Sequence, residues 1–224
     1  MRRFIRDNSL GLVFGLLFLG ALAGQAVAGH AVFNAEQVTD GLPPVSMGRY
    51  LTSADFAADV AENWQSEYLQ FFLFIMLTVW LVQKGSPESK KPDEVGRESD
   101  ERQRVGPFAT DDSPAWARAA GFRRALLSNS LGLVMGGIFL LSWLAQSVAG
   151  VSAFNERQLA DRQDPVSWAR YLAEPDFWSR TLQNWQSEFL AVASMAILAI
   201  YLRQRGSPES KPVGSSHAST GVEG

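Results

Sequence analysis

The chain contains no cysteine and only two histidines among its 224 residues. The absence of cysteine excludes disulfides, thiolate nucleophiles and cysteine-bound metal sites. His30 stands at the end of a long apolar run, and His217 lies in a small, polar C-terminal stretch. Glycine-rich phosphate loops, metal-spaced clusters and nucleophile–base pairs are also lacking. We therefore expect a protein without enzymatic activity, cofactor or bound metal, and without a nucleic-acid partner.

Charge is scarce in four blocks, although a net charge of −3, 46% hydrophobic residues and a mean hydropathy of −0.04 would suit a soluble protein. No charged residue occurs in 8–29 or in 125–155. Both stretches exceed the roughly 20 residues that a helix needs to cross about 30 Å of hydrocarbon. Two shorter apolar blocks occupy 68–83 and 189–202. Together the blocks predict four transmembrane helices, at about 8–30, 63–84, 129–151 and 184–205.

The sequence contains an internal repeat. A shift of 121 positions places NSLGLV at Asn8 on NSLGLV at Asn129, and GSPESK at Gly85 on GSPESK at Gly206. Without any gap, about 40 of 83 aligned positions carry the same residue. Matches at this level indicate a duplicated unit rather than a chance recurrence of short motifs. FN, PVS, RYL and NWQSE recur between the two ends of the unit.

The N-terminal segment has an alternative interpretation as a cleaved secretory signal. Arg2 and Arg3, an apolar run and the sequence AVA before Gly29 fit such a signal. However, the run is long for a signal core, and SVA before Gly150 repeats the pattern inside the chain. We therefore favour a membrane helix that is retained.

Each unit contains an even number of predicted membrane helices, so the two copies enter the membrane with the same orientation. About 15 of the 20 Lys and Arg residues lie in the two tails and the central linker. We therefore expect the protein in the cytoplasmic membrane, and the positive-inside rule predicts that both termini and the linker lie in the cytoplasm.

The predicted fold is all-α: two tandem parallel helical hairpins with small extracytoplasmic helical caps. The predicted domains are repeat 1 (1–90), a disordered linker (91–112), repeat 2 (113–211) and a disordered tail (212–224).

Local signals refine these elements. The first long helix is expected to stop at Gly41, and Ser53 with Asp55 can start the next helix beyond Pro43-Pro44. Ser113-Pro114 predicts another helix start, either of a short interfacial helix or of the solvated beginning of the third membrane helix. GSPESK is expected to end each second helix on the cytoplasmic side, with phosphorylation or docking as an alternative role.

Two glutamates stand at the entrance of the second and fourth predicted membrane helices. The uncharged stretches after Glu67 and Glu188 span only about 24 and 21 Å, so each carboxylate is expected a turn inside the membrane boundary. Asn63 and Asn184 precede them by one turn on the same helix face. Such carboxylates require a partner or a wet cavity. One hypothesis is a polar or ion site built from both pairs; we favour local pairing with Arg49 and Arg170 of the loops.

Small and amide residues of the first helix in each copy predict helix packing. Gln25 and Gln146 are expected to form hydrogen bonds between helices. Glycines four residues apart allow close helix approach, either inside the bundle, which we favour, or between chains of a homo-oligomer. These pairs are Gly11 and Gly15, Gly20 and Gly24, and Gly132 and Gly136.

Taken together, the NSL start, FN, PVS, RYL, NWQSE and GSPESK resemble an uncharacterised bacterial integral-membrane family known only as a domain of unknown function. The resemblance covers the chain except its linker and tails. It implies a bacterial cytoplasmic-membrane protein and supplies no activity or functional residue. The expected role is structural or partner-binding, in contact with the lipid bilayer. The alternative is a small transporter or channel component that uses Asn63/Glu67 and Asn184/Glu188.

Overall fold

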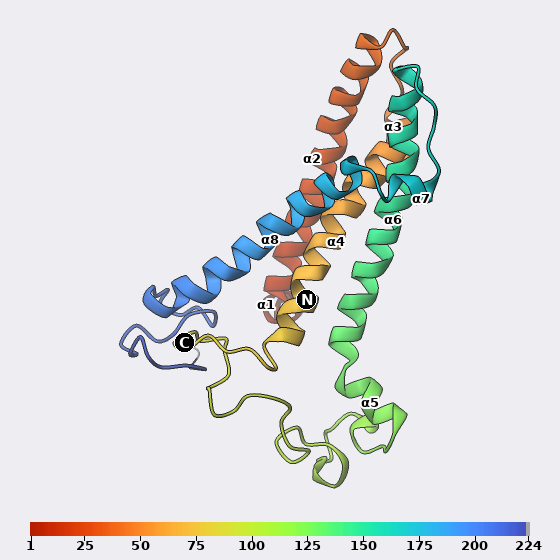
Figure 1. Ribbon diagram of the computed structural model, residues 1–224. Helices are drawn as coiled ribbons and strands as arrows, with labels where there is room; N and C mark the ends of the chain where they lie inside the picture. The colour runs from red at the N-terminus through yellow and green to blue at the C-terminus, as the bar shows by residue number, and fades with distance from the viewer. Residues whose placement is uncertain (223–224) are drawn as a thin grey trace. The chain divides into compact units, whose positions relative to one another are not determined.

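A computed structural model describes residues 1–222 of the chain, and over these residues the protein is all-helical, with no strand. Eight α-helices and two short 3-10 helices follow one another along the chain (Figure 1). Their bounds are α1 Arg2–Asp7, α2 Ser9–Thr39, α3 Met47–Leu51, α4 Ala54–Leu77, η1 Gly106–Phe108, η2 Ala115–Ala117, α5 Phe122–Ser128, α6 Ser130–Ala160, α7 Trp168–Tyr171 and α8 Pro175–Tyr201.

Corresponding helices of the two sequence copies begin 121 residues apart. This holds for α2 and α6, for α3 and α7, and for α4 and α8. The helices α2 and α6 both contain 31 residues, which is about 46 Å of helix. They continue through the FN motif, nine residues beyond the predicted ends of the membrane spans at about 30 and 151. The all-α prediction is confirmed for the described residues.

Two helices, α2 and α6, are long and apolar enough to cross a membrane. None of the residues of α2 is buried, and large side chains such as Leu10 and Leu16 are mostly exposed. The most apolar window of α6 is also mainly exposed. Both apolar helices are thus mostly exposed, which weakly suggests an association with a membrane.

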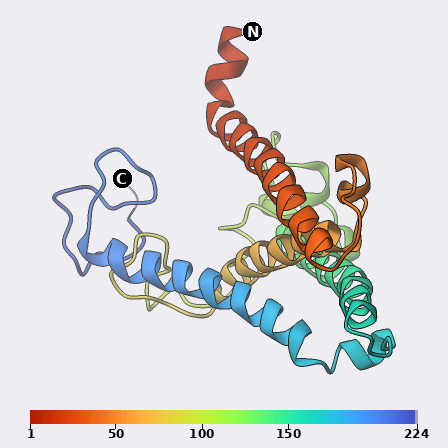
Figure 2. The ribbon, with the colours of Figure 1, turned by 90° about the horizontal axis from the view of Figure 1, so that it is seen from above.

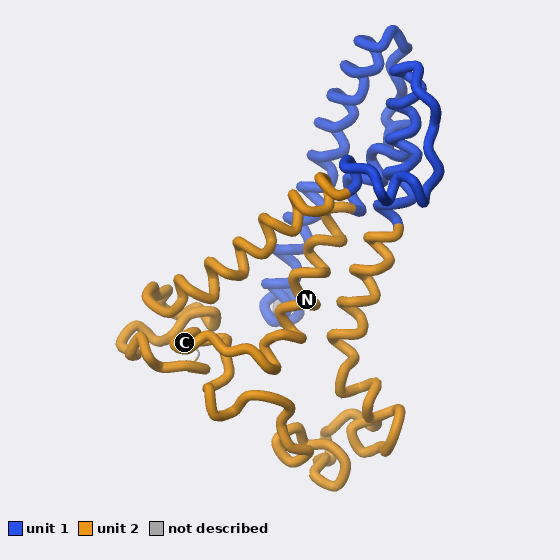
Figure 3. The backbone as a smooth tube through the Cα atoms, in the orientation of Figure 1, with its two compact units in different colours: residues 1–61, 145–177 blue, residues 62–144, 178–224 orange. Residues whose placement is uncertain are grey.

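The chain forms two compact units (Figure 3). The first contains residues 1–61 and 145–177, and the second contains residues 62–144 and 178–224. Each unit draws residues from both sequence copies. In the first unit, α2 is a continuous ribbon that begins after the bend at Asn8 (Figure 2) and leads to the loop before α3.

The helix α2 ends where the sequence predicts. Gly41 has a left-handed φ of +76°, which glycine adopts at no steric cost. Its N–H donates to Val38 O, and the N–H of Leu42 donates to Gln37 O at 2.8 Å. This pair of hydrogen bonds is a Schellman motif. In the second copy Arg162 takes the same place with a φ of +58°.

Two helical boundaries differ from the predicted ones. The predicted second membrane helix runs to residue 84, whereas α4 ends at Leu77. The Thr78 hydroxyl donates to Phe74 O at 2.7 Å, and the chain then turns. Ser113-Pro114 precedes only the 3-10 helix η2, and α5 begins at Phe122, after Gly121. Between α4 and α5, the described chain is turn and coil apart from η1 and η2.

Candidate functional site

The FN and PVS motifs build the same cap in each copy. The carboxamide of Asn34 accepts from Val45 N–H at 2.7 Å and donates to Val45 C=O at 3.1 Å. Asn155 and Val166 make the same pair of hydrogen bonds, at 2.8 and 2.9 Å. Each asparagine therefore fastens the loop onto its helix by satisfying both backbone groups of one residue. The serine that follows caps the next short helix: Ser46 accepts from Arg49 N–H, and Ser167 from Arg170 N–H.

A buried tyrosine of RYL fills the centre of each cap. Tyr50 is 3% exposed, and its ring packs against those of Phe33 and Phe56. Its hydroxyl lies so close to Gly29 that a Cβ there would be 2.1 Å away. Tyr171 and Gly150 repeat the arrangement, with the corresponding distance at 2.6 Å. These glycines of the AVAG and SVAG sequences thus allow the tyrosine to approach the helix backbone.

Ion pairs in the first unit involve the cap residues. Arg157 lies 3.4 Å from Asp176 and 4.0 Å from Asp55 of the other copy. Arg170, one of the two cations expected to pair with a membrane glutamate, binds Glu174 at 2.8 Å. Arg49, the other, is exposed. His30, expected at a membrane boundary, places Nε2 2.7 Å from Val45 O.

The two NWQSE segments meet in the second unit. Gln65 of α4 is fully buried, and its Oε1 accepts from the indole N–H of Trp185 on α8 at 2.7 Å. One turn away, Arg180 Nε donates to Glu62 Oε2 at 2.6 Å, with both side chains mostly shielded from solvent. The remaining donor of Gln65, Nε2, has no hydrogen-bond acceptor among the described residues. A neutral donor buried in this way costs about 1–3 kcal/mol.

Glu67 and Glu188 lie beside this junction in the same unit. Glu67 is exposed and Glu188 half-buried. Neither carboxylate has a hydrogen bond or ion pair with a described residue of its unit. Asn184 directs its amide to Arg180 O at 3.0 Å rather than to Glu188. Both glutamates belong to the second unit, and the choice between a shared site and local pairing stays a prediction.

The predicted packing residues divide into two groups. A Cβ on Gly132 would lie 3.2 Å from Met76 Sδ, and one on Gly136 would lie 3.0 Å from the ring of Phe72. These two glycines therefore let α6 approach α4 closely, as expected for packing within the bundle. In contrast, the described residues of the first unit leave open space around the glycines of α2 (Gly11, Gly15, Gly20 and Gly24). Gln146 is buried, and Gln25 is half-buried.

GSPESK forms the same loop after α4 and α8. Ser89 Oγ accepts from Gln83 N–H at 2.8 Å, and Ser210 Oγ accepts from Gln204 N–H at 2.9 Å. Gly85 and Gly206 both have left-handed φ values, +90° and +80°. The terminal lysine of each motif then donates to the carbonyl six residues later, Lys90 to Gly96 and Lys211 to His217. Lys211 is 1% exposed and donates to four carbonyls in all. The motif thus folds into a loop held by its own hydrogen bonds. Contrary to the prediction, it does not end the helices, because α4 ends at Leu77 and α8 at Tyr201, before the motif begins.

The comparisons with known proteins identify a family. A family described as a domain of unknown function (DUF6766) matches residues 1–222. The chain belongs to this family. No curated protein and no solved structure matches it. Among the described residues, no group of three or more His, Asp or Glu side chains could hold a metal ion.

Three residues at the contact between α4 and α8 could not be predicted by comparing the two sequence copies. Glu62 and Arg180 correspond to Gln183 and Asp59, so the ion pair joins positions where the copies differ. Gln65 recurs as Gln186, but Gln186 is exposed, and only the first copy's glutamine is buried. The sequence does show that the residues before the apolar halves of α4 and α8 are highly polar. Such polarity indicates a buried polar contact, but it does not indicate which residues form it.

Proposed function

We propose that the chain is an integral membrane protein with four membrane crossings, in two parallel hairpins, and with a structural or partner-binding role. The exposed apolar surfaces of α2 and α6 support two of these crossings. The helices α4 and α8 are about 36 and 40 Å long and carry charge mainly in their first halves, so their crossings rest on the apolar blocks that follow Glu67 and Glu188. The charge distribution places both termini and the linker in the cytoplasm and the caps outside.

One observation carries the structural role: the residues that recur in both copies bind the protein's own backbone. Asn34 and Asn155 bind loop amides, Ser89 and Ser210 bind backbone amides just before the GSPESK motif, and the glycine–tyrosine contacts fill the caps. The recurring motifs therefore support a scaffold that presents its caps, linker and lipid-facing helices to a partner.

The alternative is a transporter or channel component. It is favoured by one observation: Glu67 and Glu188 lie in the same unit, and neither forms a hydrogen bond or ion pair with a described residue of that unit. Paired carboxylates within a membrane commonly mark proton or cation pathways.

Flux through liposomes tests the two roles. Purified protein is reconstituted in vesicles that contain a pH-sensitive dye, and a potassium diffusion potential is applied. A structural protein leaves the proton and cation leak at the level of protein-free vesicles. A leak that requires the protein, and that Glu67→Gln with Glu188→Gln abolishes while the fold stays intact, contradicts the structural role and establishes the alternative.

A further inference from the structure

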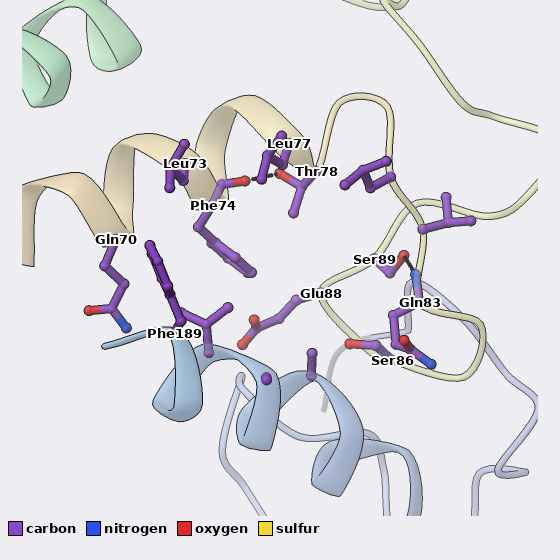
Figure 4. A pocket seen from close by; sticks show the side chains of 15 residues that line it. Gln70, Leu73, Phe74, Leu77, Thr78, Gln83, Ser86, Glu88, Ser89 and Phe189 are labelled. Atoms are coloured by element: carbon purple, nitrogen blue, oxygen red, sulfur yellow. Dashed lines mark hydrogen bonds between the residues drawn. The ribbon is translucent and has the colours of Figure 1, made fainter. Parts of the chain in front are cut away.

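Two adjoining grooves in the second unit are lined by glutamates of the two GSPESK motifs. The larger groove is about 560 Å³ in volume and lies between α4, α8 and the loop that follows α4 (Figure 4). Phe74 and Phe189 line it from the two helices, and Glu88 extends from the loop toward the space between them. An adjoining groove of about 330 Å³ shares Phe74 and Glu88, and Glu209 also lines it. Glu88 and Glu209 occupy equivalent positions of the two copies.

The groove is lined mainly by apolar side chains, with glutamates on one side. Its walls are aromatic and aliphatic, and Gln70 and Thr78 supply hydrogen-bonding groups. No lysine or arginine is among the residues that line either groove. A volume of this size is typical of small-molecule sites, which are mostly apolar with a few polar groups that fix orientation. Aromatic faces together with carboxylates attract a cation.

We propose that this groove binds a small lipophilic organic cation, with its apolar body between Phe74 and Phe189 and its positive charge at Glu88 and Glu209. The absence of a lining lysine or arginine argues against a phospholipid, because a phosphate would meet no lining cation and would lie beside two carboxylates. The binding site does not involve Glu67 or Glu188, so it is independent of the structural role and of the transport alternative.

Equilibrium dialysis with tetraphenylphosphonium tests this inference on the full-length protein in detergent. Saturable binding is expected, and tetraphenylborate, which has the same shape and the opposite charge, should bind at least about tenfold more weakly. Glu88→Gln together with Glu209→Gln should weaken phosphonium binding about tenfold, which corresponds to about 1.4 kcal/mol. Glu101→Gln, an exposed carboxylate of the linker, is the matched control and should have no effect.

Two further arms keep the test decisive. Ala193→Phe fills the groove without changing charge and should abolish phosphonium binding while far-UV circular dichroism stays unchanged. Phosphatidylethanolamine in mixed micelles should not displace the probe. Equal binding of the two probes, equal loss in the Glu101→Gln control, retention in Ala193→Phe or displacement by the lipid would each overturn the inference.

Discussion

The phenolic oxygen of Tyr50 lies directly against the Cα of Gly29, in space that any other residue's Cβ would occupy. The same contact between Tyr171 and Gly150 closes the second cap. Gly29→Ala should therefore destabilise the protein by about 1–3 kcal/mol, the usual cost of overpacking. Thermal unfolding of the purified protein measures this loss.

Two variants control this prediction. Gly24→Ala adds the same methyl group to α2 where no described residue of the unit is near, and it should not destabilise. Tyr50→Phe removes the hydroxyl and should recover part of the loss in the Gly29→Ala background. A Gly29→Ala protein as stable as the wild type would show that the cap does not pack in this way.

Arg162 ends α6 in the left-handed conformation that Gly41 adopts at the end of α2. A side chain in this region costs about 1–2 kcal/mol, and glycine avoids that cost. Arg162→Gly should raise the free energy of unfolding by about 1 kcal/mol, and Gly41→Arg should lower it by a similar amount. Denaturant titrations that give both variants the same sign would refute this reason for the asymmetry.

Gln65 and Trp185 should respond unequally to mutation. Trp185→Phe removes the indole N–H that donates to the buried Gln65 Oε1 and should cost about 1–3 kcal/mol. Gln65→Met replaces the whole buried carboxamide, including its unpaired Nε2, by an apolar group and should cost less than Trp185→Phe. Unfolding measurements on both variants and on Gln186→Met, whose glutamine is exposed, test the difference. The reverse order would contradict the buried placement of Gln65.

The caps should weaken at alkaline pH. Burial raises the pKa of Tyr50 above its ordinary value of 10.0, and Asp59, Asp55 and Glu36 raise it further because they repel the phenolate. Since the folded-state pKa is the higher one, this contribution to stability is complete below about pH 10 and is lost as the pH rises through the folded-state pKa. The unfolding midpoint of Tyr50→Phe should fall less between pH 9 and 11 than that of the wild type. Parallel curves for the two proteins would remove this role from Tyr50.

Local sequence signals predict the caps well because they act over a few residues. Gly41 marks a helix stop, and Ser53, whose Oγ accepts from Phe56 N–H at 3.2 Å, marks a helix start. The end of α4 could not be predicted in this way, because the apolar sequence around it contains no glycine or proline that would indicate a helix stop. There the Thr78 hydroxyl competes for backbone carbonyls of the last turn, and the helix ends seven residues before its predicted end.

The candidate site is only partly predictable for a related reason. Polar residues at a helix entrance predict that partners exist, and the repeat draws attention to Glu67 and Glu188, whose role stays a prediction. The partners themselves depend on tertiary packing, which places Arg180 against Glu62 and Trp185 against Gln65. The equivalent positions Asp59 and Gln183 could not form the same ion pair, so the symmetry of the sequence does not extend to the contacts.

Labelling of single cysteines most directly tests the proposed arrangement of two parallel hairpins across a membrane. The natural chain has no cysteine, so Leu42→Cys, Gln163→Cys and Glu101→Cys each introduce one defined thiol at an exposed position. A membrane-impermeant maleimide should label Leu42→Cys and Gln163→Cys in intact cells, and should label Glu101→Cys only after permeabilisation. Labelling of Glu101→Cys from outside together with both loops, or protection of one loop but not the other, would contradict the four crossings.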